Sequence, residues 1–153
     1  MKRETKNKLF ALFILLAFLG STIAYSISFV LPHENKVQTI FDRQLSEEEE
    51  SPYLKSNFVV LRFYYTDGCC ADVEKQIEDV YESTGHKLLI ERVDISKDKS
   101  AAEWLSNRVD YDKNLGLPAI LLRGRTEKLI QGNFDSLFAD ACGLYFEEIP
   151  ECM

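Results

Sequence analysis

The strongest structural signal in the sequence is the segment FVVLRFYY, residues 58–65, which leads into two adjacent cysteines. Its β-branched and aromatic residues, with one charge at Arg62, are typical of a strand buried on both faces of a sheet. The next segment, 71–84, has apolar residues at helical spacing with Glu and Lys between them. The sequence therefore predicts an α/β fold with two thiols, Cys69 and Cys70, at a strand–helix junction.

The rest of the chain alternates between strand-like and helix-like segments. We expect strands over 87–95, 117–124 and 127–132, and helices over 100–109, with Ser100 as N-cap, and over 134–146. Residues 37–41 could add an edge strand, and 46–56 is either a short acidic helix interrupted by Pro52 or a solvated linker. Because a strand–helix–strand start requires a parallel pair, this order predicts a mixed four- to five-stranded sheet flanked by helices.

The N-terminus predicts a membrane segment. Residues 9–31 are 23 residues without a charge, preceded by the basic flank 1–8. At about 1.5 Å per residue, such a helix crosses a hydrocarbon core of about 30 Å. The basic flank should stay in the cytoplasm, which places the remainder on the extracytoplasmic side as a single-pass protein. A cleaved signal peptide is the alternative, and the domain would then be secreted; the apolar run past any plausible cleavage site favours the anchor.

The charge distribution and the cysteine content limit the classes of function that the chain can have. Residues 1–31 carry a net charge of +3 and the remaining residues carry −10, which argues against nucleic-acid binding, because phosphate contacts need clustered Lys and Arg. All four cysteines lie in the part that we expect to be exported, where disulfides persist. Four cysteines permit three pairings, and the sequence does not choose between them.

Three landmarks in order resemble the thioredoxin family over residues 37–146. They are FVVLRFYYTDGC, the strand KLLIERVDIS, and NLGLPAILLRGRTEKLIQG, which resembles the family's proline loop and hairpin. The resemblance implies that Cys69 is the attacking cysteine, that Pro118 is the cis-proline facing it, and that Leu117 offers backbone groups to an extended substrate. It divides the exported part into a linker with first edge elements (32–57), a core (58–147, within a domain of about 37–147) and a tail (148–153).

The chain departs from the family pattern at the resolving position. A second cysteine should follow the first by three residues, but Asp72 stands there, so the motif is C-C-x-D. The helix N-terminus favours a Cys69 thiolate, whereas the charges of Asp67 and Asp72 oppose it. Asp72 could also serve only to accept N–H groups in the first helical turn.

The sequence does not determine which cysteines form disulfides with each other. Cys70 could resolve through a disulfide between sequence neighbours, which is a strained geometry. Cys142 or Cys152 could instead pair with a site cysteine, or they could pair with each other and fix the tail to the last helix. Free thiols are the remaining alternative.

These observations predict a membrane-anchored, exported thiol-disulfide oxidoreductase that acts on the thiols or disulfides of exported proteins through Cys69. The alternative is a redox-inactive thioredoxin-fold module for binding or assembly that lacks a resolving cysteine. We expect a monomer without a cofactor. We expect no metal site either, because the chain lacks the paired ligand spacing of a zinc site.

Overall fold

The computed structural model describes residues 37–153, and Gln38–Met153 form one α/β unit. Its elements are β1 (Ile40–Phe41), α2 (Glu47–Lys55), β2 (Val59–Tyr65), α3 (Ala71–Ser83), β3 (Leu88–Asp94), α4 (Lys99–Ser106), β4 (Ala119–Arg123), β5 (Glu127–Gln131), α5 (Leu137–Cys142) and the 3-10 helix η1 (Pro150–Cys152). The predicted anchor and its basic flank lie outside the described residues. Within residues 37–153, no helix has both the length and the apolar character needed to span a bilayer.

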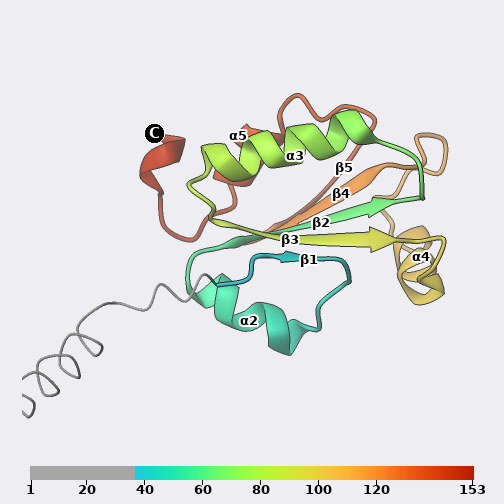
Figure 1. Ribbon diagram of the computed structural model, residues 1–153, viewed down its shortest axis with the longest axis horizontal. Coiled ribbons are helices and arrows are strands. Elements are labelled where there is room, and N and C mark those ends of the chain that lie inside the picture. The colour runs from blue at the N-terminus through green and yellow to red at the C-terminus, as the bar shows by residue number, and fades with distance from the viewer. Residues whose placement is uncertain (1–36) are drawn as a thin grey trace, which may run out of the picture. The chain divides into compact units, whose positions relative to one another are not determined.

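The five strands form one mixed sheet in the order β1-β3-β2-β4-β5 (Figure 1). β3 pairs in parallel with β1 and β2, whereas β4 runs antiparallel to both β2 and β5. β2 therefore lies in the middle, as its apolar sequence predicts, and β4–β5 is the expected hairpin. The predicted mixed sheet is confirmed, with β1 as its short fifth strand.

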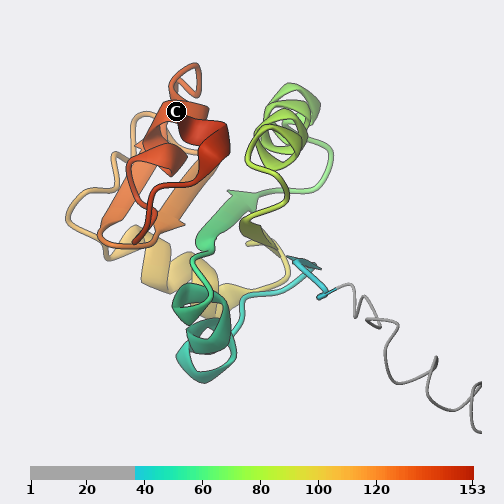
Figure 2. The same cartoon turned by 90° about the vertical axis from the view of Figure 1, so that its left-hand side faces the viewer.

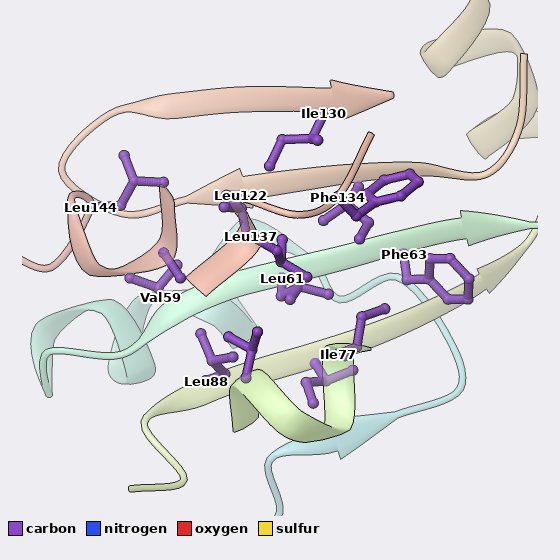
Figure 3. Close-up of a cluster of buried hydrophobic side chains, with 14 of the residues drawn as sticks. Val59, Leu61, Phe63, Ile77, Leu88, Leu122, Ile130, Phe134, Leu137 and Leu144 are labelled. Carbon is purple, nitrogen blue, oxygen red and sulfur yellow. The ribbon is translucent and has the colours of Figure 1, made fainter. Parts of the chain in front are cut away.

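Helices cover both faces of the sheet (Figure 2). Alternate residues of β2 point to opposite faces, so Leu61 and Phe63 pack with Ile77 of α3 and Leu137 of α5 in the largest core cluster (Figure 3). On the other face, Tyr64 packs with residues of α4, and residues around α2 cover the neighbouring part of the sheet. The continuous apolar run of β2 thus reflects a strand that is buried on both sides.

The structure defines the boundaries of two helices, α2 and α4, that the sequence predicts only approximately. The acidic segment is a helix, α2, which starts with a capping box between Ser46 and Glu49 and continues through Pro52. The predicted N-cap of α4 is wrong, because Asp98 accepts the N–H of Ala101 at 3.0 Å and the helix starts before Ser100.

The last helix is shorter than predicted, because the chain on either side of it is used for packing. α5 covers only Leu137–Cys142, while Phe134, Leu144 and Tyr145 are buried outside the helix. The tail is also packed: Ile149 is buried, and the side-chain oxygen of Asn57 accepts the N–H groups of residues 146 and 147, each at 3.0 Å. The C-terminal residues are therefore part of the domain.

Candidate functional site

The predicted site cysteines lie where β2 passes into α3. After β2 ends at Tyr65, the Cys69 N–H donates to the Thr66 carbonyl at 3.2 Å, and Gly68 adopts a φ of +76°. Cys70 is the N-cap of α3 with a φ of +79°, and its carbonyl accepts the first N–H groups of the helix. Cys69 and Cys70 form a disulfide with each other, and both are half-buried. The vicinal pairing is therefore the one that the structure contains.

Pro118 lies at the same end of the sheet. The Leu117–Pro118 peptide bond is cis, and β4 begins at the next residue, Ala119, which pairs with Tyr64 of β2. The segment before β4 is thus adjacent to the end of β2 that leads to the cysteines. The Leu117 side chain packs against the Tyr64 cluster, and among residues 37–153 the backbone N–H and carbonyl of Leu117 have no hydrogen-bond partner. These two backbone groups are therefore unpaired within the described residues.

The two carboxylates that we expect to modulate the site are both on the surface. Asp67 is exposed in the connection after β2, and Asp72 is exposed in the first turn of α3. Asp72 occupies the helical position at which a resolving cysteine would stand in a C-x-x-C site. Because both groups are exposed and negative, they place anionic charge beside the cysteine pair.

The second disulfide lies away from this site. Cys142 at the end of α5 is bonded to Cys152 in η1, with 5.6 Å between their Cα atoms. The neighbouring Glu151 side chain approaches Gly85, just beyond the C-terminal end of α3. The two disulfides therefore lie at opposite ends of α3, and no cysteine in the described part of the chain is free. Neither a tail-to-site bridge nor a set of free thiols occurs.

A buried polar cluster lies on the α2–α4 face and was not predicted from the sequence. Arg62 of β2, which is 5% exposed, donates through Nε to Glu91 of β3 at 2.5 Å and through Nη2 to Glu50 of α2. Arg123 of β4 contacts the other Glu50 oxygen at 3.0 Å. Trp104 of α4 stacks on Tyr64 and lies over the Arg62 guanidinium. The only indication of this cluster in the sequence is the single charge of Arg62 in an otherwise apolar strand.

Burial controls the ionisation of this cluster. Glu91 is fully buried, and removal from water raises its pKa to about 7, although the Arg62 charge acts in the opposite direction. Its Oε1 atom and the hydroxyl of Tyr64 have no hydrogen-bond partner, and burial raises the pKa of Tyr64 as well. Glu91 is thus a carboxyl group that takes up a proton near neutral pH.

This raised pKa predicts that stability falls as pH rises. The folded state favours protonated Glu91, so its contribution is complete below pH 4.5 and is lost as pH increases through about 7. The rise in the pKa of Glu91 from 4.5 to about 7 corresponds to about 3 kcal/mol of stability, since one pKa unit equals about 1.4 kcal/mol. Denaturant unfolding between about pH 5 and pH 8 should show this decline, and Glu91→Gln should remove it. If the stability of Glu91→Gln fell equally steeply with rising pH, the assignment of this pH dependence to Glu91 would be wrong.

The described residues offer few groups for a metal. Within residues 37–153, no three His, Cys, Asp or Glu side chains are placed so that they could hold a metal ion together. The chemistry that the site itself offers is that of a disulfide between two half-buried cysteines.

The strand order β1-β3-β2-β4-β5, with the cysteine pair at the start of α3 and a cis-proline just before β4, is that of a thioredoxin-like fold. Among solved structures, the chain is similar to a mutant thioredoxin from Halobacterium salinarum NRC-1, with 20% identity, coverage of 72% of this chain and 93% of that chain, and a TM-score of 0.47. It is also similar to chloroplastic thioredoxin z, with 14% identity, coverage of 70% and 96%, and a TM-score of 0.49. No protein-family model and no curated protein matches the chain.

Proposed function

We propose that this protein is a thiol-disulfide oxidoreductase whose redox centre is the Cys69–Cys70 pair. The observation that carries the proposal is the disulfide between these two residues at the N-terminus of α3. With Cys70 as the partner of Cys69, a resolving thiol is present even though Asp72 occupies the usual resolving position. The substrates would be thiols or disulfides of other proteins.

The exchange takes place in two balanced steps. A substrate thiolate attacks the Cys69 sulfur, the Cys69–Cys70 bond breaks, and Cys70 leaves as a thiolate that takes up a proton. A second substrate thiolate then attacks the substrate sulfur of the mixed disulfide, and Cys69 leaves as a thiolate that also takes up a proton. The substrate loses two electrons and two protons, and the cysteine pair gains them. The same steps in reverse reduce a substrate disulfide.

The surroundings of the pair would influence both steps. The free N–H groups at the start of the 13-residue helix α3 stabilise a thiolate, while the charges of Asp67 and Asp72 oppose it. The unpartnered backbone groups of Leu117 suit pairing with an extended substrate segment at the same end of the sheet. We therefore expect a slower thiol than that of a working thioredoxin.

The direct test is disulfide exchange with a scrambled or reduced protein substrate. Activity should fall to background in Cys69→Ser, whereas Cys70→Ser should accumulate a mixed disulfide at Cys69, detectable by mass spectrometry. The matched control is Cys142→Ser with Cys152→Ser, which removes the remote disulfide and should retain exchange. If Cys69 resists alkylation after mild reduction, and the parent protein shows only background exchange, the proposal is wrong.

A second candidate is a binding or assembly module without redox turnover. The observation that favours it is the exposed Asp72 at the usual resolving position, in an acidic setting. In that case, Cys69→Ser and Cys70→Ser would leave cellular function intact, while substitutions beside Pro118 would impair it. A redox phenotype from either cysteine variant would argue against this candidate.

We also propose that the domain is exported and anchored through residues 9–31, with residues 1–8 in the cytoplasm. The support is the 23-residue uncharged segment and the charge difference across it. The full chain should then sediment with membranes and expose its domain to added protease only on the extracytoplasmic side. Recovery of a shortened soluble chain would indicate a cleaved signal peptide instead.

A further inference from the structure

The segment before Pro118 is held by a single side chain of the neighbouring strand. Gln131, at the end of β5, accepts the Asp112 N–H through Oε1 at 2.8 Å. Its Nε2 donates to the Gly116 carbonyl at 2.7 Å and to the Asp112 carbonyl at 3.2 Å. One half-buried amide therefore binds both ends of the segment 112–116.

The position of Gln131 connects this segment to the site. Gln131 pairs directly with Ala119, the residue after Pro118, so the strand that holds the segment also holds the start of β4. Gly116 adopts a φ of +62°, and the bond to its carbonyl fixes the peptide group that enters Leu117. The orientation of the unpartnered Leu117 backbone groups therefore depends on the amide of Gln131.

We infer that Gln131 is a positioning residue for substrate binding: its amide fixes the Gly116–Leu117 peptide so that Leu117 can pair with a protein segment beside Cys69. This inference rests on the proposed function. Gln131 takes no part in the transfer of electrons or protons, and it acts on substrate binding through Leu117. A small thiol reagent, which needs no backbone pairing, should react with the cysteine pair without its help.

The test compares protein and small-molecule reactions in three variants of the full chain. Gln131→Leu removes all three hydrogen bonds, and Gln131→Glu keeps an acceptor for the Asp112 N–H but cannot donate to Gly116. Lys128→Gln is the control, because Lys128 lies on the same strand and pairs with Asp140 rather than with residues 112–116. The readouts are KM and kcat for a reduced protein substrate, with oxidised glutathione supplied to restore the Cys69–Cys70 disulfide, the rate of reduction of this disulfide by dithiothreitol, and amide exchange at residues 112–117.

In Gln131→Leu we expect KM to rise about tenfold, with kcat and the dithiothreitol rate within about twofold of the parent. Gln131→Glu also loses the bond to the Gly116 carbonyl and places a carboxylate oxygen beside it, so the rise should be at least as large, whereas Lys128→Gln should give none. Faster amide exchange at 112–117 with an unchanged KM, or an equal loss in the dithiothreitol reaction, would overturn the positioning role. Absence of exchange in the parent chain would overturn the proposed function itself, which separates the two failures.

Discussion

Arg62→Met is expected to lower the free energy of unfolding by about 3–5 kcal/mol, because it leaves the buried Glu91 without its cation and Glu50 with Arg123 alone. Glu50 and Glu91 are 1% and 0% exposed, so water cannot replace the guanidinium at either carboxyl group. Methionine has a similar length and fills much of the same space, which limits the contribution of a cavity. Denaturant unfolding at neutral pH measures the change.

The matched control for this prediction is Arg43→Met. Arg43 also donates two hydrogen bonds to a carboxylate, Glu49, but this pair is on the surface, with side chains 56% and 45% exposed. Surface pairs of this kind contribute little to stability because solvent screens their charges, so the control should be close to the parent. If the two substitutions had equal effects, the buried cluster would not stabilise the fold in the way described.

The second large effect concerns the remote disulfide. The double variant Cys142→Ser, Cys152→Ser should lose about 3 kcal/mol of unfolding free energy, since the bond closes a loop with a sequence separation of 10. Cys152 also packs against the main core cluster, so its release would loosen the end of the chain. Unfolding in denaturant without reductant is the measurement.

The chain contains its own control for this loop effect. The Cys69–Cys70 bond has a sequence separation of 1, so it removes almost no freedom from the unfolded chain. Cys69→Ser with Cys70→Ser should therefore change stability by less than about 1 kcal/mol. A larger loss from the site pair than from the Cys142–Cys152 pair would reverse the assignment of structural and redox roles.

Much of the fold could be predicted because the sequence signals were local. The apolar run of 58–65 specified a buried central strand, and the cysteine pair followed by helical spacing located the start of α3. Helix ends were less accurate, because capping depends on which nearby side chain reaches the free N–H groups. Asp98 and Ser100 are both good N-cap residues, and only the folded backbone shows that Asp98 accepts the bond.

The cysteine pairing and the polar contacts could not be predicted for a different reason. Cys142 and Cys152 come together only because the chain leaves α5 early and folds back through η1. Gln131 is 15 residues from Gly116 in sequence, and Arg62 meets Glu50 and Glu91 across three separate elements. Such contacts follow from strand register and helix placement, which a linear pattern of residue types does not encode.

The position of Trp104 has a practical consequence for optical studies. It is the only tryptophan in the chain, and its ring lies 6.0 Å from Tyr64 and 5.0 Å from the Arg108 guanidinium on the α4 face of the sheet. Its fluorescence therefore originates from one environment, on the face opposite α3. Emission from this indole would follow the separation of α4 from the sheet during denaturation, whereas the oxidation state of the cysteine pair must be followed by a chemical or mass-based label.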